Sequence, residues 1–216
     1  MSCISHENVV EICERFAKHF ANNKIELNFY SSYTCLIAVV LSAQATDKRV
    51  NIVTSELFKI ADNPDKMLKL GYEKLCKYIK SIGLYKNKAK YIIELSNKLI
   101  SDFNSIVPNN IEDLLSLPGV GRKTANVLLN HIFHKPTIAV DTHVFRVSRR
   151  LGVSYGKTPE KVEQDLMNII PDKYKMNIGY QILLHGRYVC KAIKPDCENC
   201  ILKDLCPFVY NYRNKF

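Results

Sequence analysis

The sequence predicts a protein that is almost entirely α-helical. Apolar residues recur every three or four positions along most of the 216-residue chain, the spacing that lines one face of a helix. Most prolines fall between these periodic runs, where a residue without a backbone donor ends a helix. The best strand-like run, residues 137–140 (TIAV), has no hairpin partner. We therefore expect an all-α fold.

The expected helices follow one another with short breaks. The first, residues 7–20, carries glutamates between its apolar positions, so it is expected to be a packed helix and not a leader. The longest apolar run, residues 33–43, is far shorter than the ~20 residues that a membrane span needs. Further helical runs cover residues 50–61, 64–70, 72–82, 88–103, 111–117, 122–133 and 142–151.

Composition narrows the class of protein. With 47% hydrophobic and 24% charged residues, the chain is expected to be globular and to bury a substantial core. Its formal net charge of +10 predicts an anionic partner, either nucleic acid or an acidic membrane surface. No expected helix is strongly basic on one face, which argues against the membrane surface. We expect a cytoplasmic protein.

A glycine hairpin separates two of the expected helices. Pro118 ends the first helix, and Gly119 and Gly121 allow a tight turn with positive φ and let another molecule approach the backbone. A helix that begins after such a turn presents free N–H groups to a phosphate. The helix-hairpin-helix over residues 111–133 is therefore expected to grip a DNA backbone without reading sequence. A structural turn between two packed helices is the alternative.

Lys123 stands in the first turn of the helix that follows the hairpin. The apolar stripe of that helix lies on the opposite side, so Lys123 is not expected to be a core residue. A cation at a helix N-terminus is disfavoured by the helix dipole, which favours the neutral amine. A neutral lysine amine is a nucleophile suited to Schiff-base chemistry. A plain phosphate contact is the alternative role for Lys123.

Asp141 follows an apolar run and precedes a short helical one. Aspartate is among the best N-cap residues, so Asp141 is expected to cap the helix over residues 142–151. A carboxylate at the start of a helix can also face an active site, and the two roles are compatible.

The eight cysteines divide into two groups. Cys3, Cys13, Cys35 and Cys76 are scattered among apolar residues and are expected to be buried free thiols. Cys190, Cys197, Cys200 and Cys206 are crowded near the C-terminus with the spacing C-x6-C-x2-C-x5-C. Four such thiolates can converge on structural zinc or on a [4Fe–4S] cluster, and the spacing does not separate these two. Unrelated thiols or two disulfides are a further alternative.

Six segments in this order resemble the endonuclease III family of bacterial DNA glycosylases with AP-lyase activity. They are LSAQATD (41–47), IGLYKNKA (82–89), LPGVGRKTANV (117–127), VDTHVFRVSRRLG (140–152), ILLHGRYVC (182–190) and the four-cysteine segment. The resemblance covers most of the chain from Leu27 to Cys206. It implies two helical domains: a helical barrel over residues 25–135 that holds the hairpin, and a cluster domain formed by residues 1–24 and 136–216.

The resemblance also implies a cofactor and the roles of individual residues. The four C-terminal cysteines match the family's ligands of a [4Fe–4S] cluster, and no other cofactor is implied. Lys123 matches the catalytic lysine that attacks the sugar C1′, and Asp141 matches the catalytic aspartate. Gln44 and Leu84 match the positions that fill the gap left by a flipped nucleotide; alone, they suggest a helix-end polar residue and a core leucine.

Other residues are expected to contact DNA or the substrate. Arg122 is expected to contact phosphate, with a solvated arginine as the alternative. Lys191 and Lys194, in the loop between the first two clustered cysteines, are also expected to touch phosphates. His143 is expected to line the substrate pocket, or else to be a hydrogen-bonded structural histidine.

The implied function is base excision repair of oxidised pyrimidines. The partner is double-stranded DNA that contains damaged bases or abasic sites, no membrane is involved, and the protein is expected to be a monomer. One alternative is a monofunctional adenine or mismatch glycosylase of the same superfamily, whose members generally lack a lysine at the position of Lys123. The other is a non-catalytic DNA-binding module with a structural metal.

Overall fold

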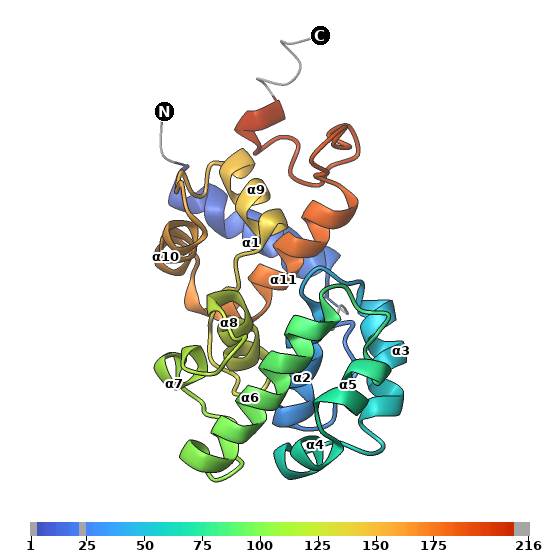
Figure 1. The fold of residues 1–216 in the computed structure, drawn as a ribbon. Helices are drawn as coiled ribbons and strands as arrows, with labels where there is room; N and C mark the ends of the chain where they lie inside the picture. Colours follow the sequence, from blue (N-terminus) through green and yellow to red (C-terminus); the bar gives the residue numbers. More distant parts are fainter. Residues whose placement is uncertain (1–3, 22–24, 210–216) are drawn as a thin grey trace. The chain divides into compact units, whose positions relative to one another are not determined.

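A computed structural model describes residues 4–21 and 25–209 of the chain. All regular structure in these residues is helical (Figure 1), which confirms the all-α prediction, and residues 137–140 form no strand. The chain divides into two compact units. We call Ile25–His134 the central unit, and Met1–Lys24 together with Lys135–Phe216 the terminal unit. Cys3 lies outside the described residues.

The terminal unit contains four longer helices among its described residues, where residues 207–209 are also helical, and the central unit contains seven helices. Those of the terminal unit are α1 (His6–His19), α9 (Thr142–Leu151), α10 (Pro159–Ile169) and α11 (Asp172–Tyr188). Those of the central unit are α2 (Ser32–Ser42), α3 (Asp47–Leu57), α4 (Pro64–Leu70), α5 (Tyr72–Tyr78), α6 (Tyr85–Phe103), α7 (Ile111–Leu115) and α8 (Arg122–His131). No helix among the described residues is long and apolar enough to cross a membrane.

Helix α11 organises the terminal unit because both α1 and α9 pack against it. A Cβ added at Gly186 of α11 would lie 2.8 Å from Cβ of His143, so α9 and α11 approach closely at this glycine. Arg15 of α1 binds the carboxylate of Asp204 with two hydrogen bonds of 2.6 and 2.9 Å and donates a third to the carbonyl of Ile201. These contacts join the N-terminal helix to the segment that carries the last two clustered cysteines.

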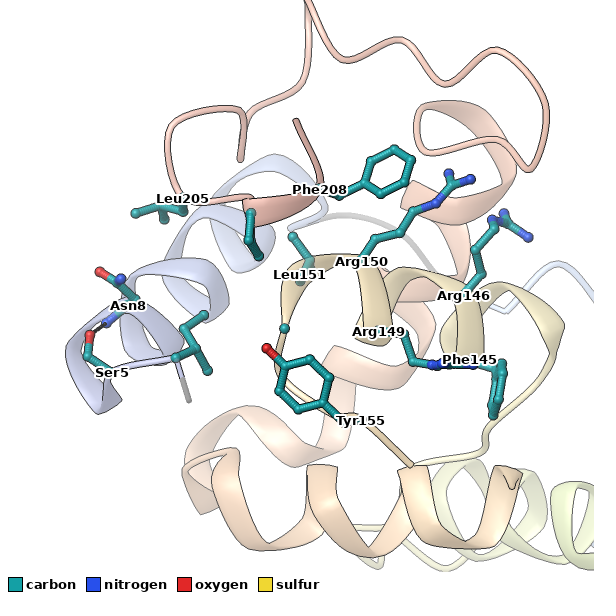
Figure 2. A pocket seen from close by; sticks show the side chains of 13 residues that line it. Ser5, Asn8, Phe145, Arg146, Arg149, Arg150, Leu151, Tyr155, Leu205 and Phe208 are labelled. Carbon is teal, nitrogen blue, oxygen red and sulfur yellow. Dashed lines mark hydrogen bonds between the residues drawn. The ribbon is translucent and has the colours of Figure 1, made fainter. Parts of the chain in front are cut away.

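The terminal unit also contains a surface hollow of about 780 Å³. Figure 2 shows Ser5 and Asn8 at the start of α1 on one side of this hollow, and Arg149 and Tyr155 on another. The guanidinium of Arg149 lies 5.4 Å from the ring centre of Phe145. The lining residues of this hollow include neither Lys123 nor Asp141, so its size does not mark it as the catalytic site.

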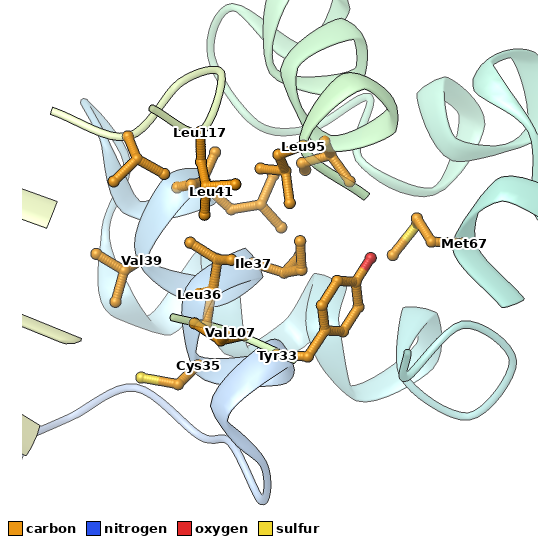
Figure 3. Packing of buried hydrophobic residues seen from close by; sticks show 14 of the residues in the cluster. Tyr33, Cys35, Leu36, Ile37, Val39, Leu41, Met67, Leu95, Val107 and Leu117 are labelled. Atoms are coloured by element: carbon orange, nitrogen blue, oxygen red, sulfur yellow. The ribbon is translucent and has the colours of Figure 1, made fainter. Parts of the chain in front are cut away.

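The core of the central unit is built around α2, into which the longest apolar run of the sequence folds. Every residue from Tyr33 to Leu41 is buried, so α2 has no solvent face over this stretch. Figure 3 shows side chains of α2 such as Leu36 and Leu41 among Leu95 of α6 and Leu117 of the hairpin. Helices α3, α6 and α8 all pack on α2, which fixes the hairpin helix α8 on a buried support.

Candidate functional site

The hairpin joins α7 to α8, and its two glycines have different roles. Gly119 has φ +77, and a Cβ there would lie 2.8 Å from Cβ of Tyr91, so no side chain fits. Gly121 is the N-cap of α8 with φ −93, so only Gly119 of the two takes a positive φ. A Cβ at Gly121 would meet no atom within 4 Å, which leaves the approach to the start of α8 open.

No side chain caps the N-terminus of α8. Gly121, Arg122 and Lys123 are exposed, so the positive end of the helix faces solvent. Backbone N–H groups in this position bind anions such as phosphate. The exposed, uncapped start of α8 therefore has the geometry of an anion site.

Lys123 is exposed, as predicted, while the opposite face of α8 buries Ala125, Leu128 and Leu129 in the core of the central unit. Within the ranges that the structure describes, no carboxylate or carbonyl pairs with the Lys123 amine. The Lys123 side chain is therefore exposed and is not held by another group of the described residues.

Asp141 is the N-cap of α9, which confirms the capping prediction. Its Oδ1 accepts hydrogen bonds of 2.8 Å from the backbone N–H groups of both His143 and Val144. Its Oδ2 lies 3.1 Å from Nδ1 of His143, an arrangement that is a hydrogen bond when Nδ1 carries the proton. The side chain of Asp141 is 13% exposed, so the carboxylate is oriented by its neighbours and still reaches solvent.

Gln44 and Leu84 lie on neighbouring loops of the central unit. Both have positive φ, +55 for Gln44 and +57 for Leu84, which is uncommon for residues with side chains. Leu84 is 59% exposed, so the interpretation of Leu84 as an ordinary core leucine is wrong. A Cβ at Gly83 would lie 3.6 Å from the carbonyl oxygen of Gln44, so the two loops adjoin.

The four C-terminal cysteines line one small cavity in the terminal unit. Burial raises the pKa of the Cys200 thiol to about 11, and the other three cysteines also act to raise it. Four thiolates this close together repel one another unless a cationic group sits between them. The donor set therefore fits a metal centre.

The four cysteines are not spaced for a single metal ion. Among the described residues, which include all four clustered cysteines, no three His, Cys, Asp or Glu side chains are spaced to hold one metal ion. Zinc would hold four sulfurs about 3.8 Å apart, since its Zn–S bonds are about 2.3 Å long. In an iron–sulfur cluster each thiolate bonds a different iron, so the four sulfurs can lie farther apart than they do around zinc.

Two residues beside the cysteines were not predicted from the sequence. Arg150 of α9 donates a 3.4 Å hydrogen bond to Sγ of Cys190 and another of 2.7 Å to the carbonyl of Lys191. Nε2 of the buried His185 lies 3.6 Å from Sγ of Cys200. Burial lowers the pKa of His185 to about 4, so its imidazole is neutral at pH 7. Only tertiary packing brings these side chains to the cysteines, so no local pattern could identify them.

Lys191 and Lys194 are exposed in the loop between Cys190 and Cys197. The carbonyls of Lys191 and Ala192 accept hydrogen bonds from Arg150, which holds the base of this loop against α9. The loop therefore presents two cations to solvent from a fixed base.

Comparison with known proteins identifies the family. A model of the HhH-GPD superfamily of base excision DNA repair proteins matches residues 37–172, and a model of the iron–sulfur binding domain of endonuclease III matches residues 190–206. The endonuclease III of Rickettsia conorii (strain ATCC VR-613 / Malish 7) is 52% identical over 205 residues, which cover 95% of this chain and 98% of that protein. The chain belongs to the endonuclease III family.

Two solved structures of endonuclease III have the same fold. One is a trapped covalent intermediate of endonuclease III with DNA, at 41% identity and a TM-score of 0.91 over 97% of this chain and 99% of that one. The other is a non-covalent endonuclease III–DNA complex, with the same identity and TM-score over 98% and 99% of the two chains. As a member of this family, the chain is a base excision repair enzyme, a DNA glycosylase and AP lyase with a [4Fe–4S] cluster.

The two glycines of the hairpin predict opposite mutant phenotypes. Gly119→Ala should destabilise the protein by about 2 kcal/mol, because it adds a strained φ and a contact with Tyr91. Gly121→Ala should cost less than about 1 kcal/mol, since its φ is ordinary and the space is open. It should nevertheless weaken duplex DNA binding about fivefold, because the added methyl group would keep a phosphate from the backbone N–H groups at the start of α8. Urea unfolding and fluorescence anisotropy measure the two effects, and a reversed pattern would contradict this account of the hairpin.

Cys200→Ser should remove the cluster and destabilise the terminal unit, because serine is a poor ligand for iron and the site depends on four thiolates. Iron content and visible absorbance report the cluster, and thermal unfolding reports stability. Cys76→Ser is the matched control, since Cys76 is a partly buried free thiol of the central unit. Full iron content in the Cys200→Ser protein would remove Cys200 from the ligand set.

Proposed function

We propose that this enzyme removes oxidised pyrimidines from duplex DNA and then cleaves the strand, with Lys123 as the nucleophile. The observation that carries this proposal is an exposed lysine amine, with no partner among the described residues, in the first turn of the uncapped helix α8. The same hairpin supplies the anion site that would hold the DNA backbone beside it.

Lys123 would act in two steps. Its amine lone pair attacks the sugar C1′ and the bond from C1′ to the base breaks, with the base taking the bonding electrons and then a proton. Loss of the amine proton and opening of the sugar give a Schiff base between Lys123 and C1′. That Schiff base is the electron sink for removal of a C2′ proton and departure of the 3′ phosphate, which is β-elimination.

Asp141 would supply the carboxylate for this reaction. Positive charge develops on the sugar as the base departs, and a nearby carboxylate stabilises that charge and takes part in proton transfers. Support comes from the two backbone hydrogen bonds at Oδ1, which fix the carboxylate without protonating it. His143, which interacts with Oδ2, would then act by orienting Asp141 as well as by lining the pocket.

The remaining residues would bind DNA or the cluster. Gly119, Gly121 and Arg122 would hold the phosphate backbone at the hairpin, and the exposed Lys191 and Lys194 would add contacts beside the cluster. Gln44 and Leu84 would enter the gap left by the flipped nucleotide, a role that the exposure of Leu84 supports. The proposed cluster ligands are Cys190, Cys197, Cys200 and Cys206.

The units would divide these tasks between them. The central unit corresponds to the proposed barrel domain with the hairpin, and the terminal unit to the proposed cluster domain. When bound, the cluster would stabilise the C-terminal segment. We further propose that the enzyme works as a monomer on DNA in the cytoplasm, in association with the nucleoid.

Replacing the nucleophile tests the central claim. Duplex DNA with one thymine glycol is incubated with enzyme and borohydride, which reduces a Schiff base to a stable adduct. Wild type should form the adduct, whereas Lys123→Ala should form none and should release the base on the order of 10³-fold more slowly. Lys59→Ala, which removes an exposed lysine paired with Glu56, is the control and should trap DNA normally. An adduct formed by Lys123→Ala would assign the nucleophile elsewhere.

Asp141→Asn separates the charge of this residue from its capping role. Asparagine caps helices as well as aspartate does, and its side-chain oxygen accepts the same backbone hydrogen bonds. Thermal stability should therefore change little, while single-turnover base release should fall about 10²-fold because the charge is lost. Wild-type kinetics in this variant would leave Asp141 with a capping role alone.

A further inference from the structure

Lys88 of α6 is a charged residue buried in the core of the central unit. Its relative exposure is 4%. Its Nζ donates a 2.9 Å hydrogen bond to the carbonyl of Leu41 and a second hydrogen bond to the carbonyl of Ala43. Burial lowers the pKa of the amine, and no carboxylate among the described residues pairs with it. The carbonyls at the C-terminus of α2 are therefore what compensates this charge.

These hydrogen bonds lie next to Gln44. Ala43, one of the two acceptors, immediately precedes Gln44 and is the C-cap of α2. Gln44 has φ +55, so the chain turns sharply at this residue after α2 ends. A hydrogen bond of 3.0 Å from the amide of Ala45 to the carbonyl of Ser42 closes the turn.

The backbone of Lys88 holds the second loop. Its amide donates a 3.0 Å hydrogen bond to the carbonyl of Leu84, which is the N-cap of α6 and has φ +57. Lys88 therefore bonds both loops: its side chain donates to the carbonyl of Ala43, and its backbone amide donates to the carbonyl of Leu84. The loops also adjoin directly, because a Cβ on Gly83 would lie 3.6 Å from the carbonyl oxygen of Gln44.

Both loops are in backbone conformations that need support. A left-handed conformation costs a residue with a side chain about 1 kcal/mol or more, so it persists only where neighbouring contacts hold it. An apolar side chain at position 88 would fill the core without the cost of desolvating an amine, but it would leave the carbonyls of Leu41 and Ala43 without their donor.

We propose that Lys88 is a positioning residue that holds Gln44 and Leu84 in the arrangement in which they enter the DNA gap. This inference rests on the proposed gap-filling role of those two residues. Lys88 itself touches no substrate, and it acts by joining the end of α2 to the start of α6.

The test is a double-mutant cycle with Lys88→Met and Gln44→Ala. Methionine has a similar length and volume but donates no hydrogen bond. Single-turnover base release is measured on a thymine glycol duplex. Each single variant should react at least tenfold more slowly than wild type, and the double variant should be within twofold of the slower single variant. Lys90→Met, an exposed lysine two residues along α6, should react at the wild-type rate.

A second readout does not depend on activity. Hydrogen exchange at the Ala45 amide, which closes the Gln44 turn, should be at least tenfold faster in Lys88→Met than in wild type, with exchange in the centre of α6 unchanged. If Lys88→Met is too unstable to assay, Lys88→Gln, which is shorter but keeps an N–H donor, takes its place. Lys88→Gln should show the same non-additivity with Gln44→Ala, with a smaller loss of the rate of base release.

The outcomes separate the two proposals. Failure of the wild-type protein to release the base would count against the proposed function, and hydrogen exchange would still decide the role of Lys88. Unchanged exchange at Ala45, a Lys88→Met rate within twofold of wild type, or multiplicative effects in the double variant would each overturn the positioning role.

Discussion

The central unit depends on the complete burial of α2. A helix with no polar face over nine residues, from Tyr33 to Leu41, is stable only when other helices surround it. Helices α3, α6 and α8 supply that cover. The same packing fixes the two features on which the proposed chemistry rests, since α8 begins at the hairpin and α6 begins at Leu84. The hydrophobic effect thus determines where the polar groups of the central unit are presented.

Lys88, the clustered cysteines and Lys123 differ in which neighbouring groups interact with them. Lys88 is buried and its amine is held by backbone carbonyls at the end of α2, so it serves as a fixed link. Burial raises the pKa of the Cys200 and Cys206 thiols, the neighbouring cysteines add to that rise, and a bound metal centre would stabilise the thiolates. Lys123 has no partner among the described residues and stands exposed at the positive end of α8, which is why we propose it as the nucleophile. The two lysines therefore differ in whether hydrogen-bond acceptors already hold the amine.

Asp141 caps α9, and the catalytic role that we propose for it would use the same hydrogen bonds. Its Oδ1 satisfies two backbone donors at the start of α9, and its Oδ2 is oriented by His143. The cap stabilises the helix and also removes freedom from the carboxylate. Preorganisation of this kind lowers the reorganisation needed when positive charge develops on the sugar. The carboxylate stays partly open to solvent.

The sequence by itself determined the features that depend on residues within one or two helical turns. Helical periodicity predicted the all-α fold and the exposed side of α8, the residue type at 141 predicted a cap, and four nearby cysteines predicted a metal centre. Only the tertiary structure revealed that Leu84 is exposed, that Lys88 is buried, and that Gly121 has an ordinary φ. It alone brought Arg150 and His185 to the cysteines. The physical reason is that burial and pairing across 15 or 40 residues are set by which helices pack together, and no local pattern of side chains records that choice.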